Sequence, residues 1–296
     1  MFPEWQISSI TPEDRAAVSA FVRSATWQYT HFDYPRHEVL ARPGYQVHNQ
    51  AGKRIGVMTC GMDEPPIARI FLAAVDSRER PQQVVSALLE PSARDMRGAG
   101  ATTLTFLGWS PWLARSLRGI GFETLTTVVT YSRRPAGELA PGNLDVRLRP
   151  ALDADVDTLV DLDRAAFEPL WRYSASMHRR LVGSAAHCII AELDGVPVGY
   201  QTGDIARDRG HIIRLVVHPD WQRRGVGTRL LVDVLEFFQQ VRIGEVLVNT
   251  QADNRASRRL YERSGFVRWA EEAPVLVTAL ASETTEIHFP SSEVIA

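Results

Sequence analysis

The sequence predicts an α/β fold with two tandem units of one kind, each a twisted central sheet (an α+β mixed sheet) with flanking helices. Three observations support this prediction. The chain has 296 residues, 45% hydrophobic and 23% charged, which is enough for two ordinary domains. The order of strand and helix patterns in the first half recurs in the second, at an offset of about 140 to 144 residues. A segment rich in proline and glycine, "RRPAGELAPGN", separates the halves.

The elements of the two halves correspond in order. Each half opens with a strand pattern ("WQISSI"; "LDVRLRP") and a helix pattern with acidic residues near its start. Three strand patterns follow, "YQVHNQ", "RIGVMTCG" and "ARIFLAAV" in the first half and "HCIIAEL", "VPVGYQTGD" and "HIIRLVV" in the second. A helix, a strand ("TLTFLG"; "EVLVNT"), another helix and a Gly-Phe pair complete each half. We expect a first domain at 1–134, a linker at 135–143 and a second domain at 144–296.

Charge and cysteine content restrict the class of partner. The formal net charge is −2, so the chain as a whole offers no electrostatic attraction for nucleic acid or an anionic membrane, and we expect a small partner. Cys60 and Cys188 have neither metal-ligand spacing nor a disulfide framework, so we expect no metal and a reducing compartment. The N-terminus does not read as a signal peptide, and no apolar run approaches the roughly 20 residues of a membrane span. These observations predict a cytoplasmic protein.

The stretch "HPDWQRRGVGTRL" places two glycines between a strand pattern and an amphipathic helix pattern. Backbone N–H groups at the start of a helix have no internal partner, and the helix dipole adds positive potential there, so this turn is suited to an anion such as a pyrophosphate. Arg223 and Arg224 add positive charge. The alternative is a tight glycine turn with a solvated basic face. Nucleotide-binding patterns of the Walker and Rossmann types do not fit, because the lysine of one and the third glycine of the other are missing.

Two motifs resemble the GCN5-related N-acetyltransferase (GNAT) superfamily. The pattern Gln/Arg-x-x-Gly-x-Gly/Ala occurs at Gln222 to Gly227, and "NTQADNRASRRLYERSGF" is similar to the fifth strand and following helix of that family. The resemblance covers roughly residues 144 to 280 and implies acetyl-CoA as the cofactor. It also implies that cofactor contacts come from the turn and two neighbouring segments: Leu215, Val216, Val217, Gln222, Arg223, Arg224, Gly225, Val226, Gly227, Thr228, Asn254 and Ser257.

The resemblance implies attack of a primary amine on the thioester. A lysine-like amine has a pKa of about 10.4, so the amine must lose a proton and the departing thiolate must gain one. Tyr261 occupies the position of the family's acid, and His211 falls where several members place a glutamate base. A tyrosine packed on a helix and a polar strand-end histidine are the alternatives. Glu168, Trp171 and Asp204 lie in segments that border the acceptor site in the family.

The first copy departs from the motif where the cofactor would bind. Arg80, Gln82, Gln83 and Val85 stand at the positions of Gln222, Arg224, Gly225 and Gly227, while Ser110 and Leu117 replace Asn254 and Tyr261. We therefore expect residues 1–134 to be a degenerate copy without cofactor, in a layout similar to that of mycothiol synthases.

Three functions remain open. The sequence favours an N-acetyltransferase acting on a small amine or a peptide N-terminus. A non-catalytic acyl-CoA-binding or regulatory module and a purely structural protein are the alternatives.

Overall fold

The computed structural model describes residues 5–134, 137 and 139–280, which form two compact units. Within the described residues, the first unit contains residues up to Thr127 together with the segment from Ala273, and the second contains Val128–Glu272. Each unit has a mixed sheet with flanking helices, which confirms the predicted fold class. This division falls inside two long strands, Glu123–Arg133 and Val267–Ala279, while the domain bounds 1–134 and 144–296 with a linker at 135–143 stay a prediction.

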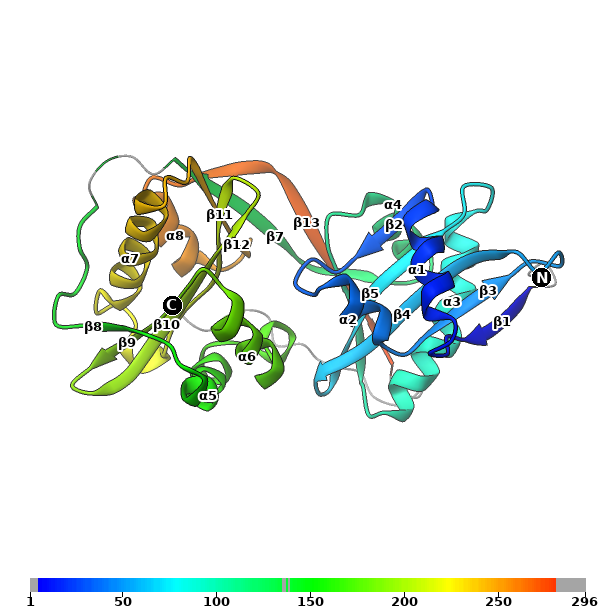
Figure 1. The fold of residues 1–296 in the computed structure, drawn as a ribbon, viewed down its shortest axis with the longest axis horizontal. Helices are drawn as coiled ribbons and strands as arrows, with labels where there is room; N and C mark the ends of the chain where they lie inside the picture. Colours follow the sequence, from blue (N-terminus) through cyan, green and yellow to red (C-terminus); the bar gives the residue numbers. More distant parts are fainter. Residues whose placement is uncertain (1–4, 135–136, 138, 281–296) are drawn as a thin grey trace. The chain divides into compact units, whose positions relative to one another are not determined.

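The first unit contains six strands from the first half of the chain (Figure 1). Five of them and β13 form a sheet in the order β1-β3-β4-β5-β6-β13, in which only β5 and β6 are parallel. The elements are β1 Gln6–Ser9, α1 Arg15–Ser24, β2 Trp27–Thr30, α2 Arg36–Ala41, β3 Gly44–His48, β4 Arg54–Glu64, β5 Ile67–Val75, α3 Pro81–Gly98, β6 Thr103–Leu107 and α4 Pro111–Arg118.

The second unit repeats this arrangement with the strand order β7-β12-β11-β10-β9-β8, and only β11 and β12 are parallel. The elements are β7 Glu123–Arg133, β8 Arg147–Pro150, α5 Val156–Ala166, α6 Ala175–Ser184, β9 His187–Leu193, β10 Val196–Ala206, β11 Arg209–Val217, α7 Val226–Gln240, β12 Glu245–Gln251, α8 Arg255–Arg263 and β13 Val267–Ala279. Three short 3₁₀ helices are η1 Asp153–Asp155, η2 Pro169–Trp171 and η3 Pro219–Trp221. None of the helices described has the length and apolar composition of a membrane crossing.

The last strand of each copy completes the sheet of the other unit. From the first copy, β7 pairs antiparallel with β12 from Val246↔Arg133 to Gln251↔Val128. From the second copy, β13 pairs antiparallel with β6 from Val275↔Leu107 to Ala279↔Thr103. Each sheet therefore depends on a strand from the other half of the sequence.

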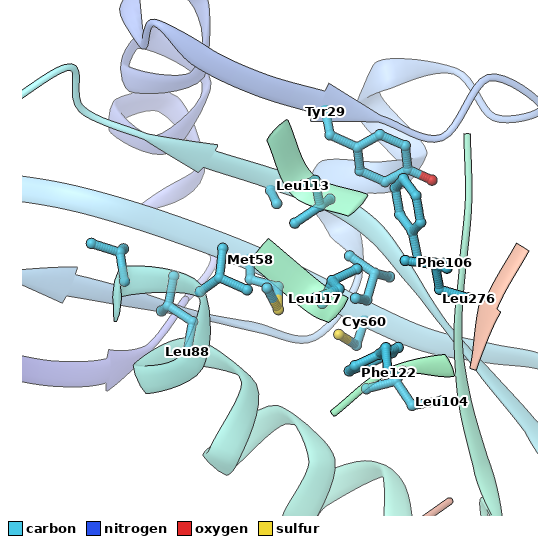
Figure 2. Packing of buried hydrophobic residues seen from close by; sticks show 14 of the residues in the cluster. Tyr29, Met58, Cys60, Leu88, Leu104, Phe106, Leu113, Leu117, Phe122 and Leu276 are labelled. Carbon is cyan, nitrogen blue, oxygen red and sulfur yellow. The ribbon is translucent and has the colours of Figure 1, made fainter. Parts of the chain in front are cut away.

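The exchanged strands also contribute to the two cores. In the first unit Leu276 of β13 is fully buried and joins the cluster around Phe106, Leu104 and Leu117 (Figure 2). In the second unit Val129 and Tyr131 of β7 join the cluster formed by α7, β12 and α8. Burial of apolar side chains stabilises a fold by roughly 1.5–3 kcal/mol for each large residue, so the exchange supplies part of the stability of both units.

Candidate functional site

The parallel strands of the second unit separate after a short ladder. Pairing of β11 with β12 runs from Arg209↔Glu245 to Ile212↔Val248 in the described structure. On its other edge β11 remains paired with β10 as far as Gly199↔Val217. The main chain of Leu215, Val216 and Val217 thus lies beside the opening between β11 and β12. Leu215 and Val217 pack into the cluster of α7 and Val216 into that of α5, because successive side chains of a strand point to opposite faces.

The predicted anion-binding turn connects β11 to α7. Arg223 and Gly225 have φ angles of 60° and 79°, and Gly225 is the N-cap of α7. Backbone that includes residues with positive φ can direct neighbouring N–H groups into one concave surface that suits an anion. The first turn of α7, which contains Val226, Gly227 and Thr228, has no acidic residue that would oppose an anion at the helix N-terminus. This donor set fits a diphosphate.

Side chains around the turn are arranged to leave its backbone accessible. Val226 is buried in the cluster with Val198 and Leu230, while Arg223 and Arg224 are exposed. The guanidinium of Arg224 lies 4.7 Å from the ring centre of Trp221. Gln222 donates from Nε2 to the carbonyl of Val217 at 3.4 Å, which links the turn back to β11. The cationic groups are therefore at the surface, where they can meet an anion.

Helix α8 carries three of the predicted residues in its first two turns. Asn254 is the N-cap, and its Oδ1 accepts from the backbone N–H of Ser257 at 3.0 Å. Tyr261 is buried beside Tyr131 and Phe266. Burial raises the pKa of the Tyr261 hydroxyl, and a hydrogen bond with Ser257 partly opposes this effect. The phenol therefore keeps its proton at neutral pH and is available as a proton donor.

Strand β7, which comes from the first copy, contacts α8 through Tyr131. The hydroxyl of Tyr131 on β7 donates to Oε1 of Glu262 at 2.8 Å and accepts from Nε of Arg258 at 3.2 Å. The rings of Tyr131 and Tyr261 are 6.1 Å apart between centres. The position of Tyr261 thus depends on a residue from the first copy, which the sequence did not reveal because the two residues are far apart in the chain.

His211 and Asp204 lie opposite one another in the β10–β11 ladder. Burial lowers the pKa of His211, with the charge of Arg209 acting in the same direction and that of Asp204 opposing it. The imidazole is therefore neutral near pH 7 and can accept a proton. The structure brings these two predicted residues together, although the sequence analysis assigned them separate roles.

A buried ion pair fixes the loop that holds Glu168 and Trp171. Asp163 of α5 is fully buried and accepts from Nε and Nη2 of Arg214 on β11, both at 2.8 Å. Arg214 also donates from Nη2 to the carbonyl of Trp171 at 2.7 Å, and its guanidinium carbon lies 3.7 Å from the ring centre of Phe167. Asp163 accepts further hydrogen bonds from the backbone of Tyr173 and the hydroxyl of Tyr200. Glu168 is exposed at the start of η2.

The Arg214–Asp163 pair was missed by the sequence analysis. The two residues are 51 positions apart in the sequence, and the local hydrophobic pattern around each of them fits any polar residue at that position. Only the packing of α5 against β11 brings them together. A buried ion pair with its remaining lone pairs satisfied is retained where it fixes a particular geometry, here the position of the loop between α5 and α6.

The opening between the parallel strands of the first unit is filled by the chain itself. Pairing of β5 with β6 ends at Arg69↔Thr105, but β2 then pairs antiparallel with β5 from Thr30↔Leu72 to Trp27↔Val75. The hydroxyl of Tyr29 on β2 donates to the carbonyl of Leu107 at the end of β6 at 2.8 Å. In the second copy the corresponding segment forms η2 and leaves β11 unpaired at this edge. The sequence analysis did not predict β2.

The start of α3 also differs from the start of α7. Arg80 is the N-cap of α3 with extended φ and ψ, and Pro81 follows at the first helical position. Proline has no N–H to offer an anion. Val85 and Leu117 are buried in the core of the first unit, and Ser110 is the N-cap of α4. The residues that replace the cofactor motif therefore have structural contacts of their own.

Comparison with known proteins agrees with this geometry. Residues 156–266 match the acetyltransferase (GNAT) family. The chain is 28% identical over 121 residues to an uncharacterized N-acetyltransferase of Methanocaldococcus jannaschii, a match that covers 40% of this chain and 76% of the relative. It is 26% identical over 223 residues to the mycothiol acetyltransferase of Acidimicrobium ferrooxidans, covering 67% of this chain and 69% of the relative.

Structural similarity extends over both units. A tandem GNAT protein from the clavulanic acid biosynthesis pathway superposes with a TM-score of 0.63 over 95% of this chain and 100% of its own length, at 15% identity. The match to the GNAT family lies within the second unit, which contains the strand-to-helix turn. The fold of the whole chain is similar to that of a tandem GNAT protein, which agrees with the tandem layout that the sequence analysis predicted.

Proposed function

We propose that this protein transfers the acetyl group of acetyl-CoA to a primary amine of a small molecule or a peptide N-terminus, by direct attack on the thioester. The observation that carries the proposal is the combination of a helix N-terminal turn suited to a diphosphate with the opening between β11 and β12 that leads away from it. Acetyl-CoA supplies the activated acyl group and a thiolate leaving group. The relative named mycothiol acetyltransferase supports a small-molecule amine as one acceptor class.

The residues of the second unit divide into binding and catalytic groups. The amides from Arg223 to Thr228 would hold the pyrophosphate, and the main chain of Leu215 to Val217 would pair with the amides of the pantetheine arm. Asn254 and Ser257 would lie on the other side of the arm. Asn254 accepts from the N–H of Ser257, and its Nδ2 donates to Oε1 of Gln251 at 3.4 Å, so the second N–H of that amide nitrogen is the group it could offer a ligand.

The reaction requires two proton transfers. The amine nitrogen forms a bond to the acyl carbon, the carbon–sulfur bond breaks, and the sulfur leaves as a thiolate. His211 would accept the proton that the amine loses, directly or through water, and a lowered pKa keeps it neutral for this role. Tyr261 would donate a proton to the thiolate. Glu168, Trp171 and Asp204 would border the acceptor, with Arg214 holding the loop of the first two.

A screen of acceptors tests the proposal. Release of free thiol from acetyl-CoA should be measured with amines, amino-acid derivatives and short peptides, and at least one class should accelerate it. The matched control is Gly227→Glu, because the nearest atoms to a Cβ at Gly227 are side-chain carbons of Leu260, Val217 and Leu215, at ordinary contact distances of 3.5–4.0 Å. The new carboxylate should prevent cofactor binding by repelling the phosphates and leave the melting temperature nearly unchanged.

A non-catalytic acyl-CoA-binding module is the second candidate. The proton-donor role proposed for Tyr261 favours the enzyme, because binding alone needs no proton donor. Tight acetyl-CoA binding with no thiol release above background across the whole panel would support the module and contradict the proposed activity. Failure of acetyl-CoA to raise the melting temperature of the wild type would contradict both.

A further inference from the structure

The linker between the two copies contacts the back of the phosphate turn. Asn143 donates from Nδ2 to the carbonyl of Arg224 at 3.0 Å, and its backbone N–H donates to the carbonyl of Gly225 at 3.3 Å. Its Oδ1 accepts from the N–H of Asp145 at 3.0 Å, which closes a small turn and fixes the side chain. The single residue Asn143 thus binds two consecutive carbonyl groups of the turn.

Binding of the Arg224 carbonyl fixes the direction of the amide that follows it. A trans peptide unit is planar, and its C=O and N–H groups point in opposite directions. A carbonyl of Arg224 held toward the linker therefore turns the N–H of Gly225 away from it. The carbonyl of Gly225 also accepts from the N–H of Arg229 at 3.0 Å, so α7 itself fixes the direction of the Val226 amide. The Gly225 amide belongs to the set that the proposed function assigns to the pyrophosphate.

We propose that Asn143 is a positioning residue that orients the Gly225 amide toward the diphosphate of the cofactor. The inference rests on the proposed function of the second unit. It adds to that unit a residue outside the family motif, on the segment that connects the two copies.

Close packing at Gly142 supports the same conclusion. This residue has a φ of +76°, and a Cβ built on it would lie 2.5 Å from the backbone nitrogen of Arg229 and 2.9 Å from the carbonyl oxygen of Gly225. A side chain cannot be accommodated there without moving the linker away from the turn. Glycine at 142 therefore permits the close approach that places Asn143 on the two carbonyls.

Calorimetric titration with two ligands tests the inference. CoA contains the pyrophosphate and pantetheine lacks it, so an effect on the turn should appear only with CoA. Asn143→Ser keeps an oxygen that can accept from Asp145 but is too short to reach Arg224, and Asn143→Ala removes both side-chain interactions. We expect both variants to bind CoA about five- to tenfold more weakly, the effect of one lost hydrogen bond, and to bind pantetheine as the wild type does.

A control variant tests whether weaker CoA binding comes from the orientation of the phosphate turn or from the general loss of an asparagine-closed surface loop. Asn49 in the first unit makes a similar turn, since its Oδ1 accepts from the N–H groups of Ala51 and Lys53 at 3.1 and 3.0 Å. Asn49→Ala should leave CoA affinity unchanged. Gly142→Ala should also weaken CoA binding, because the added methyl group would move the linker away from the turn. Unchanged CoA affinity in both Asn143 variants, or an equal loss for pantetheine, would overturn the inference. A wild type that binds no CoA would instead overturn the proposed function.

Discussion

At the residue scale, Tyr261 distinguishes a catalyst from a binding protein. Tyr261→Phe removes the hydroxyl but keeps the ring among Tyr131 and Phe266, so the affinity for acetyl-CoA should change little. Turnover should fall by roughly 10²- to 10⁴-fold, the range for a positioned general acid, in kcat and kcat/KM alike. Single-turnover measurements of thiol release are the appropriate assay, because they exclude product release from the observed rate.

The control for this variant is Tyr45→Phe. The hydroxyl of Tyr45 donates to the carboxylate of Asp95 at 2.7 Å and lies in the first unit, away from the proposed site. This variant should retain wild-type turnover. A Tyr261→Phe enzyme with the wild-type single-turnover rate would assign the proton to water or another side chain.

A second residue-scale prediction concerns His178, which is fully buried beside Asp163 and Arg214. Burial lowers its pKa to about 4, and the charge of Arg214 acts in the same direction while that of Asp163 opposes it. In the unfolded chain the pKa is near 6.5, so between about pH 6.5 and 4 the unfolded state binds the extra proton. The free energy of unfolding should therefore fall as the pH falls through this window, by an amount on the order of 3 kcal/mol from this group.

Chemical denaturation of the wild type and of His178→Gln at several pH values measures this contribution. Glutamine keeps a polar side chain but does not titrate, so the variant should show a smaller loss between pH 6.5 and 4. His31 has a lowered pKa for the same main reason, burial, and continues to contribute at the acid end of the window. If the free energy of unfolding of the two proteins had the same pH dependence, His178 would not contribute to the loss of stability in acid.

At the element scale, β2 is the reason we predict that the first copy holds no cofactor. Its four residues pair with the edge of β5 that corresponds to the edge of β11 proposed for the cofactor. We expect one acetyl-CoA per chain, because β2 already satisfies that edge with hydrogen bonds and the start of α3 contributes Pro81 to the turn. Calorimetry should return a stoichiometry near one, and Gly227→Glu should abolish it altogether. A residual site in that variant would locate a cofactor in the first unit.

Most of the order of elements could be predicted from the sequence, but β2, α2, α6, the final strands β7 and β13, and the strand exchange were not. Strand and helix periodicity, the glycines at 225 and 227, and the motif around Tyr261 are local signals, and they were sufficient for the fold class and for a turn between a strand and a helix at these glycines. The segment Trp27–Thr30 becomes a strand only because the opening beside β5 is available to it. The patterns of β7 and β13 are equivalent in the two copies, so the local sequence does not indicate which sheet each strand completes. Tertiary packing determines both the formation of β2 and the exchange of β7 and β13.

At the scale of the whole molecule, the exchange of β7 and β13 predicts the behaviour of fragments. A fragment of residues 1–134 lacks Leu276 in its core, and a fragment of residues 144–296 lacks Val129 and Tyr131. Each also leaves a sheet edge unpaired, which favours aggregation. Produced separately, the fragments should be unfolded or aggregated, and produced together they should form a one-to-one complex with the spectrum of the intact chain.

The matched control for the fragments is a cut chain. A protease site introduced at the exposed Gly137 and cleaved after folding should leave a particle of unchanged mass under native conditions, since both exchanged strands remain in place. Two fragments that each fold as stable monomers would show that the exchange is dispensable.

The exchange of strands also bears on the history of the duplicated gene. A copy without a cofactor, as we propose for the first, would ordinarily be free to shrink or disappear by deletion. Here deletion of the first copy would take away β7, and with it the hydroxyl of Tyr131 that holds Glu262 and Arg258 beside Tyr261. Selection on the function of the second copy therefore acts on the sequence of the first, and the two are inherited as a single unit.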